Sequence, residues 1–289
     1  RPTLTERLES SDGTVKYLWE MPDGAAVESV LMSDGNRHTA CISSQVGCAY
    51  GCSFCATGKM GFIRNLSPWE ITAQVRELLI QSGPGAINNI VFMGMGEPLH
   101  NWPAVDGALT ILNDPRGMGI GARKITVSTV GIIPKLRKFA ERPEQFRLAL
   151  SVHSADGAQR VKIMPVERSF PLKEVLRVVE SFSRRVTFEY VMIEGLNDRS
   201  EDISLLAEVA RPIGALVNLL PLHPGGASGH TPTRRSDIHR FAASLRELGV
   251  NVTVRKSRGV DINAACGQLW RDASRTGHIE TKQDGDIKE

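Results

Sequence analysis

Short runs of hydrophobic residues alternate along most of the chain with longer stretches in which apolar positions recur at helical spacing. The runs that predict buried β-strands are residues 38–43, 89–93, 124–128, 147–152, 186–191, 216–220 and 251–255. Helical patterns lie between most of them, at about residues 103–113, 133–141, 171–183, 200–210 and 235–248. Repeated strand-then-helix units predict a parallel sheet with crossover helices. We therefore expect an α/β fold in which seven strands form an open or incompletely closed barrel.

The N-terminal part of the chain has a different pattern. Residues 14–20 and 27–32 are strand-like and flank the turn sequence Pro22-Asp23-Gly24, and Ser33-Asp34-Gly35-Asn36 leads into the next apolar run. Asx-Gly sequences between apolar runs favour β-hairpins. This part of the chain is therefore expected to form an antiparallel β extension.

These patterns divide the chain into three parts. We expect the N-terminal β extension to occupy residues 1–37 and the partial barrel to occupy residues 38–271. Residues 272–289 are polar and lack apolar periodicity, which is typical of a disordered tail.

One helix start carries a specific local signal. Ser67 can cap the helix, Pro68 suits its first position, and Glu70 stands at the spacing of a capping box. A helix is therefore expected to begin at this point.

The composition fits a globular protein. Of the 289 residues, 41% are hydrophobic and 23% are charged, which argues against a wholly disordered chain and a coiled coil. No apolar run approaches the ~18 residues of a membrane helix, and the first residues lack the apolar core of a secretory signal. Five cysteines is an odd number, which argues against a closed disulfide framework. We expect a cytoplasmic, monomeric protein without membrane association, whose cysteines do chemistry.

Three of the cysteines form a motif directly after the first predicted barrel strand. Cys48, Cys52 and Cys55 have C-x3-C-x2-C spacing, so a loop that folds back can bring their thiolates to one metal centre. Three protein ligands to a [4Fe–4S] cluster leave one iron open to an outside ligand. This spacing resembles the signature of the radical S-adenosylmethionine (SAM) superfamily, which implies a partial (β/α)6-type barrel and SAM on the open iron. The alternative is a zinc site completed by His38 or Cys41.

Glycines and small polar residues follow several predicted strands, where the working residues of a β/α barrel lie. They are Gly96, Glu97, Ser128, Ser151, Val152 and His153. A glycine lets a ligand approach the backbone, Glu97 could take an amino group, and the serines could bind hydroxyl groups and a carboxylate. Each residue alone also has an ordinary structural explanation. Their placement on consecutive strand ends favours a binding site.

Two cysteines remain outside the motif. Cys41 precedes the three-cysteine loop, and Cys266 lies in a late segment between Gly259 and Gly267. A free cysteine is often a small buried hydrophobic residue. The flanking glycines instead favour an irregular segment, which suits a thiol that must move.

Four stretches together resemble the RlmN/Cfr family of radical-SAM RNA adenine methyltransferases. They are residues 41–55, 93–98, 125–131 and 261–269, and the likeness extends from about Val27 to Leu269. The resemblance implies methylation of an sp² ring carbon of adenosine, with C2 favoured, in 23S rRNA and in tRNA. Methylation at C8 is the alternative within the family. Outside it, the alternatives are a radical-SAM enzyme with a non-RNA substrate and a non-catalytic RNA-binding protein with a structural metal.

The resemblance also implies roles for individual residues. Cys266 would accept a methyl group from one SAM, and a radical from a second SAM would activate that group, so two SAM molecules are used per turnover. Cys41 would then attack the Cys266 sulfur and release the product, leaving a transient disulfide. Glu28 matches the family's proton acceptor. The SAM contacts would be the six strand-end residues named above together with His223.

The chain departs from the family pattern at two points. His223 stands where the family usually has asparagine, and an imidazole can still donate or accept a hydrogen bond. The small helical module that precedes the β extension in the family is not found in this sequence, and this bears on how RNA docks. The expected partners are RNA and a reducing electron donor such as flavodoxin or ferredoxin, and the preferred RNA contact is the basic stretch Arg255, Lys256 and Arg258.

Overall fold

Seven parallel strands form the centre of the fold, in a computed structural model that describes residues 1–223 and 229–269. In spatial order they are β4 (Arg37–Cys41), β7 (Asn89–Phe92), β8 (Ile125–Thr129), β9 (Arg147–Ser151), β10 (Val186–Met192), β11 (Leu216–Pro221) and β12 (Asn251–Val254). Spatial order follows chain order, as expected for repeated strand–helix units with crossover connections. The predicted α/β fold and its seven strands are confirmed.

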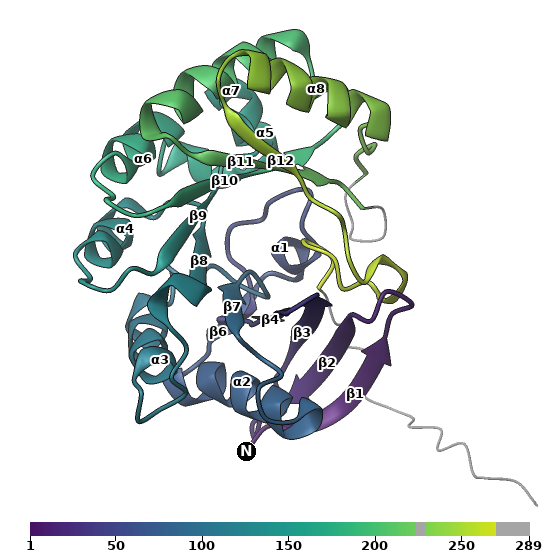
Figure 1. The fold of residues 1–289 in the computed structure, drawn as a ribbon, viewed down its shortest axis with the longest axis vertical. Coiled ribbons are helices and arrows are strands. Elements are labelled where there is room, and N and C mark those ends of the chain that lie inside the picture. The colour runs from purple at the N-terminus through teal and green to yellow at the C-terminus, as the bar shows by residue number, and fades with distance from the viewer. Residues whose placement is uncertain (224–228, 270–289) are drawn as a thin grey trace, which may run out of the picture.

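Helices cover the outside of the curved sheet (Figure 1). They are α2 (Pro68–Ser82), α3 (Trp102–Asn113), α4 (Ile133–Ala140), α5 (Gly157–Ile163), α6 (Leu172–Val179), α7 (Ser200–Ile213) and α8 (Arg235–Glu247). Helix α1 (Ala56–Met60) instead follows the three-cysteine loop and lies in the middle of this view. Single 3-10 turns lie at Ala122–Lys124, Pro165–Arg168 and Val260–Ile262. The predicted start of α2 is confirmed, because Ser67 and Glu70 form the reciprocal capping box with Pro68 in the first turn.

The central strands are buried because side chains cover both of their faces. All four residues of β7 are buried, and β9 buries its three central residues, Leu148, Ala149 and Leu150. Nearly continuous apolar runs of this kind are typical of parallel strands under helices. The open edge strand β12 alternates instead between exposed and half-buried positions.

Three antiparallel strands extend the same sheet beyond β4. They are β1 (Thr3–Glu9), β2 (Val15–Glu20) and β3 (Ala26–Asp34), and β3 turns into β4 through the predicted Gly35-Asn36 turn. Trp19 anchors this part: its ring stacks on Tyr17 at 5.5 Å, and its indole N–H donates to Ser29 Oγ at 2.6 Å. Strand β1 was not predicted.

Side chains, not strand pairing, join the two edges of the barrel in the part of the chain that the structure describes. The segment after β12 crosses from the barrel to the antiparallel strands (Figure 1). Arg258 in this segment pairs with Asp34 at the end of β3, at 2.9 Å. The predicted tail, residues 272–289, lies outside the described residues.

Candidate active site

The three-cysteine loop runs from the short strand β5 (Gln45–Gly47) to α1 and folds back on itself. Strand β5 pairs with β6 (Phe62–Asn65), and the Cys48 N–H donates to Gly61 O at 2.9 Å. Gly47 makes this return possible, because its φ is +73° and a Cβ there would lie 1.9 Å from Gly61 O. The close return places all three thiols on one short loop.

The loop thiols are close enough to affect one another. Burial raises the pKa of Cys48 to about 12, and the neighbouring Glu97 and Cys55 act in the same direction. Burial also raises the pKa of Cys52, as do Cys55 and Cys48. Thiolates in such a place require a compensating positive charge, which a cluster of iron ions supplies. The donor set therefore fits an iron–sulfur cluster.

Among residues 1–223 and 229–269, no three His, Cys, Asp or Glu side chains are placed closely enough to hold a metal ion. This holds for the zinc alternative and for the iron–sulfur cluster alike, because both need three thiolates that converge.

A fully buried arginine lies behind the loop and was missed by the sequence analysis. Arg160 on α5 has no exposed surface. Its guanidinium donates to the carbonyls of Val152, at 3.0 Å, and Ser151, at 3.1 Å, and pairs with Glu167. Its positive charge also lowers the pKa of Cys52, against the effect of burial. Arg160 therefore fixes the end of β9 and stabilises negative charge on the loop.

Glu97 follows β7 in a tightly packed turn. Three donors converge on its carboxylate: Thr129 Oγ1 at 2.6 Å, Val130 N at 2.9 Å and Leu99 N at 2.9 Å. Burial nevertheless raises its pKa to about 7. The preceding Gly96 has φ +98°, and a Cβ there would lie 2.5 Å from Gln45 Cβ. The packing of Gly96 and the three hydrogen bonds to Glu97 therefore hold the Glu97 carboxyl group in a fixed position after β7.

The other predicted strand-end residues differ in burial and in whether their polar atoms already have hydrogen-bond partners. Ser128 and Ser151 are half-buried, and Val152 is fully buried. His153 is buried with φ +54°, its Nδ1 accepts the Val191 N–H at 3.0 Å, and its ring packs edge-on against Phe54 at 4.6 Å. Burial lowers its pKa to about 3, so the imidazole is neutral. One ring nitrogen is thus committed to the fold.

A cavity of about 580 Å³ occupies the interior of the barrel and is lined by both remaining cysteines. Cys41 enters it from the end of β4, and Cys266 enters it from the segment after β12. All five cysteines are free thiols, so no disulfide is present. Burial raises the pKa of Cys41, and the nearby Cys266 acts in the same direction. The structure therefore brings together two thiols that stand far apart in the sequence.

The Cys266 segment packs directly on the three-cysteine loop. The Ala56 N–H donates to Gly267 O at 2.7 Å, and Thr57 Oγ1 donates to Leu269 O at 2.6 Å. The segment is irregular, as predicted, with positive φ at Gly259 and Gly267. Cys266 is accessible from the cavity. The second thiol and the cluster loop are thus neighbours.

The turn between β1 and β2 holds the same segment from its other side. Asp261 accepts from Ser10 Oγ at 2.5 Å and from the Ser11 N–H at 3.1 Å, and Asp12 accepts the Gly259 N–H at 3.0 Å. Hydrogen bonds from Thr14 and Gly259 outweigh burial and lower the pKa of Asp12 to about 2. The N-terminal extension therefore positions the segment that carries Cys266.

Glu28 lies on β3 and is only 4% exposed. Val30 is the Cα partner of Cys41, so Glu28, two residues before Val30, lies on the same face of the sheet as that thiol. Its carboxylate pairs with Lys16 Nζ at 3.0 Å, and Lys16 Nζ also donates to Asn263 O at 3.4 Å. Lys16 was not predicted to matter. It links the buried acid to the segment of Cys266.

His223 lines the cavity after β11 and is bound by hydrogen bond to Ser257. Burial lowers the pKa of the His223 imidazole, which favours the neutral ring. Its imidazole therefore faces the same space as the two thiols.

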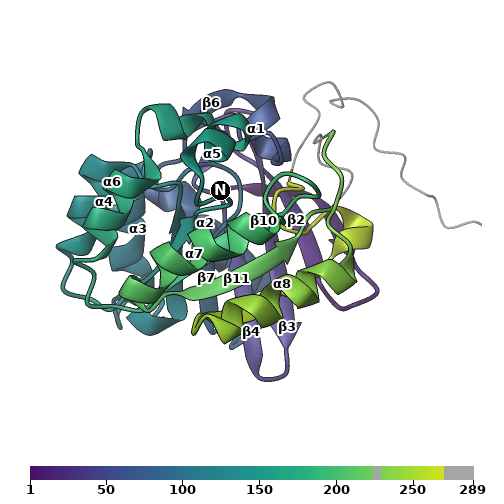
Figure 2. The same ribbon diagram turned by 90° about the horizontal axis from the view of Figure 1, so that it is seen from above.

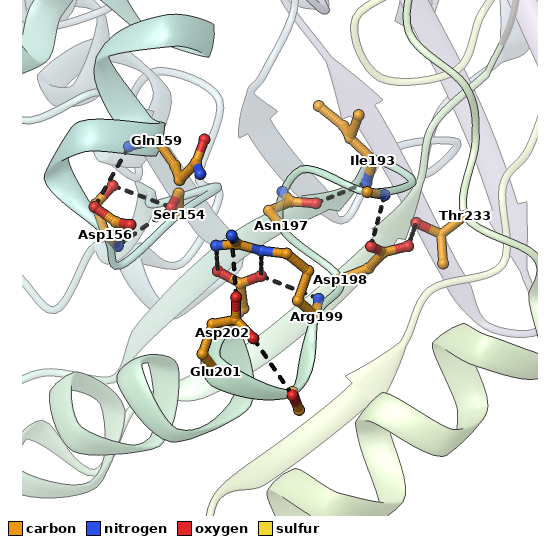
Figure 3. Close-up of polar contacts among 12 residues, drawn as sticks. Ser154, Asp156, Gln159, Ile193, Asn197, Asp198, Arg199, Glu201, Asp202 and Thr233 are labelled. Atoms are coloured by element: carbon orange, nitrogen blue, oxygen red, sulfur yellow. Dashed lines mark hydrogen bonds and ion pairs between the residues drawn. The ribbon is translucent and has the colours of Figure 1, made fainter.

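Polar contacts fix the loops after β9 and β10 (Figure 3). Asn197, which the sequence analysis did not single out, accepts the Ile193 N–H at 2.8 Å and donates to His153 O and Val191 O, each at 2.6 Å. Asp198 accepts from Thr233 Oγ1 at 2.8 Å. These bonds hold the strand ends that face the cluster loop.

Comparison with known proteins agrees with this geometry. The Radical SAM superfamily matches residues 42–207. A probable dual-specificity RNA methyltransferase RlmN from Gemmatimonas aurantiaca is 55% identical over 92% of this chain and 74% of that protein. The RlmN of Anaeromyxobacter dehalogenans is 45% identical over 93% of this chain and 76% of that protein. The chain belongs to the RlmN/Cfr family of radical-SAM proteins.

A solved structure from the same superfamily has the same fold. A radical SAM methyltransferase from Sphaerobacter thermophilus superposes with a TM-score of 0.87 at 44% identity, over 93% of this chain and 81% of that one. The resemblance found in the sequence is thereby confirmed for fold and family. A search of the described residues finds no helix long and apolar enough to span a membrane.

Proposed function

We propose that this protein methylates C2 of adenosine in RNA through a methyl group carried on Cys266. The observation that carries the proposal is the shared cavity: Cys41 and Cys266 both line it, and the Cys266 segment packs on the three-cysteine loop. Support comes from relatives named as dual-specificity RNA methyltransferases. We propose 23S rRNA as the main substrate and tRNA as a second one.

The cofactors would be a [4Fe–4S] cluster and SAM, two molecules per turnover. Cys48, Cys52 and Cys55 would hold the cluster. The SAM-binding residues would be Gly96, Glu97, Ser128, Ser151, Val152, His153 and His223. When bound, these groups supply a methyl group and a radical that abstracts hydrogen.

The two thiols have separate tasks. An adenine ring carbon is not nucleophilic, so Cys266 first takes the methyl group by displacement and later passes it to the ring as a carbon radical. Cys41 then attacks the Cys266 sulfur. The S–S bond forms as the C–S bond breaks, and the released carbon keeps the electron pair and takes up a proton.

Glu28 would accept the proton lost from the modified ring carbon, and the unpaired electron left on the ring would return to the iron–sulfur cluster, which would have given one electron to cleave SAM. The Lys16 ammonium, 3.0 Å away, offsets the negative charge of the buried carboxylate. Because Lys16 also contacts the Cys266 segment, acid and thiol are held in one arrangement.

Glu97 predicts a pH dependence of SAM binding. Its carboxyl group has a pKa raised to about 7 by burial, so it loses its charge as the pH falls below 7. We expect SAM affinity to fall by up to about tenfold per pH unit below 7, because the SAM ammonium loses its counter-charge. Equilibrium binding of SAM to the reconstituted protein measures this. Glu97→Gln should bind weakly with a flat profile, and a flat wild-type profile would contradict the assignment.

The cavity is rich in positive charge, which suits RNA. Arg37, Arg147, Arg185, Arg255 and Lys256 line it, and Arg258 is held by Asp34. Burial lowers the pKa of Arg37, and the nearby Arg255 and Arg185 act in the same direction. Such clustering of like charges favours an anionic ligand.

Charge reversal at Arg255 and Lys256 is expected to weaken RNA binding and to make it less salt-dependent. For single-stranded RNA, the slope of log K against log salt becomes shallower by about 0.7 for each phosphate that the protein no longer neutralises. Fluorescence anisotropy across a salt series measures the slope, and Arg116→Glu, at a side chain that is 92% exposed, is the matched control. An unchanged slope would remove these residues from the RNA interface.

The deciding experiment is an assay of the reconstituted protein with labelled SAM against total rRNA and tRNA. Mass spectrometry of the digested nucleosides should find 2-methyladenosine, and 8-methyladenosine alone would overturn the choice of C2. We further propose a cytoplasmic monomer, reduced by a flavodoxin or ferredoxin, in which residues 1–37 form the extension and the barrel begins at residue 38.

A further inference from the structure

Glu189 is a buried carboxylate on the wall of the cavity with no part in the chemistry described above. It lies on β10 and is 7% exposed. Among the described residues that line the cavity, the other carboxylate is Asp34, which is exposed at the rim and pairs with Arg258. In Figure 2 the β3–β4 hairpin that ends at Asp34 projects at one edge and α1 lies at the opposite edge, so Asp34 is remote from the cluster loop.

The hydrogen bonds of Glu189 are unevenly divided between its two oxygens. Asn218 Nδ2 donates to Oε1 at 2.9 Å, and Thr187 Oγ1 donates to the same oxygen at 3.3 Å. Within residues 1–223 and 229–269, Oε2 receives no hydrogen bond. This oxygen is not among the fully buried polar atoms that lack a partner, and Glu189 lines the cavity, so Oε2 is open to accept an N–H from a ligand there.

The carboxylate and the reactive thiol line one cavity. Glu189 and Cys266 are both in its lining, and burial raises the pKa of Cys266, with Glu189 acting in the same direction. Burial raises the pKa of Glu189, and the hydrogen bond from Asn218 and the charge of Arg255 act in the opposite direction. Asn218 is the Cα partner of Glu189 on β11 and has a second N–H beyond the one given to Oε1.

We propose that Glu189 and Asn218 read the Watson–Crick edge of the flipped target adenine. Glu189 Oε2 accepts the N6 amino group, and the second N–H of Asn218 donates to N1. This inference rests on the proposed function and identifies the residues that select the base. Because C2 adjoins N1, this pairing holds C2 next to Asn218 in the cavity that Cys266 also lines, whereas pairing through N7 would hold C8 there.

The test pairs a protein change with a substrate change. Purine riboside lacks the N6 amino group, so placed at the target position it removes the donor without changing the ring. Wild-type kcat/KM should favour adenosine over purine riboside by about tenfold to a hundredfold. In Glu189→Gln, the amide oxygen is held by Asn218 and Thr187, so the amide N–H₂ faces the N6 amino group. Activity on adenosine should fall, activity on purine riboside should stay, and the ratio should approach one.

The matched control is Asp34→Asn, which makes the same change at the other end of the cavity and should keep the wild-type ratio. An equal loss on both substrates in Glu189→Gln, with an unchanged melting temperature, would show a structural role and overturn the proposal. An unchanged ratio would overturn it as well. Either result with active wild-type protein leaves the proposed function intact, whereas wild-type protein that methylates no RNA would refute that function itself.

Measurements of RNA binding test separately whether the protein contacts the Watson–Crick edge of the target adenine. RNA with 7-deazaadenosine at the target should bind as adenosine does, whereas 1-deazaadenosine should bind about tenfold more weakly. The reverse order would overturn the assignment of the Watson–Crick edge.

Discussion

Replacing Cys266 by alanine is expected to reduce RNA methylation by at least about a thousandfold, equal to about 4 kcal/mol of transition-state stabilisation. The adenine ring carbon cannot attack a methyl donor directly, and Cys266 is the thiol next to the cluster loop that opens into the cavity. Transfer of labelled methyl groups from SAM to RNA measures the loss.

The control is that Cys266→Ala keeps the loop and its iron. Cys48, Cys52 and Cys55 are unchanged, and the backbone bond from Ala56 to Gly267 does not use the thiol. Iron content should therefore equal that of the wild type. A variant that kept full turnover would instead favour an enzyme that needs no methyl-carrying thiol.

Replacing Cys41 by alanine is expected to stop the reaction one step later, with protein and RNA joined covalently. The ring carbon would already be bonded to the one-carbon unit that the Cys266 sulfur carries. Cys41 lines the same cavity, and its thiol would break the bond between that carbon unit and the Cys266 sulfur. Denaturing gels should show the covalent protein–RNA adduct as a slowly migrating band, which should migrate faster after treatment with ribonuclease. Multiple turnover should fall by at least about a hundredfold.

The double variant Cys41→Ala, Cys266→Ala should give no such species, because the carrier is missing. Release of methylated RNA by Cys41→Ala at the wild-type rate would contradict the assigned role. The two single variants thus separate the loading of the carbon unit from its release.

The parts of the fold that could be predicted are those with a local signal. Strands β7 to β11 are mostly apolar runs between helical periods, and the start of α2 is a capping box made by Ser67 and Glu70. Strand β1 was missed because its sequence, TLTERLE, is mostly polar and exposed. The short elements α1, β5 and β6 have too few residues for a periodicity to show.

The parts of the site that could not be predicted depend on contacts between distant segments. Arg160 looks like any basic residue on an amphipathic helix, yet it is fully buried under the ends of two strands. The pairing of Lys16 with Glu28 depends on the register of β2 against β3. The free oxygen of Glu189 is visible only once β10 and β11 are aligned. The spacing of residues within one segment cannot predict such contacts between distant segments.

The docking of the Cys266 segment on the three-cysteine loop bears on the order in which iron is inserted and the chain folds. During synthesis the loop leaves the ribosome long before the segment exists, and through that interval its thiols lack their later cover. Iron inserted then meets an accessible loop. Iron offered after the segment has docked meets a loop that is already bonded to Gly267 and Leu269, so we expect the centre to mature most readily while the chain is still unfinished.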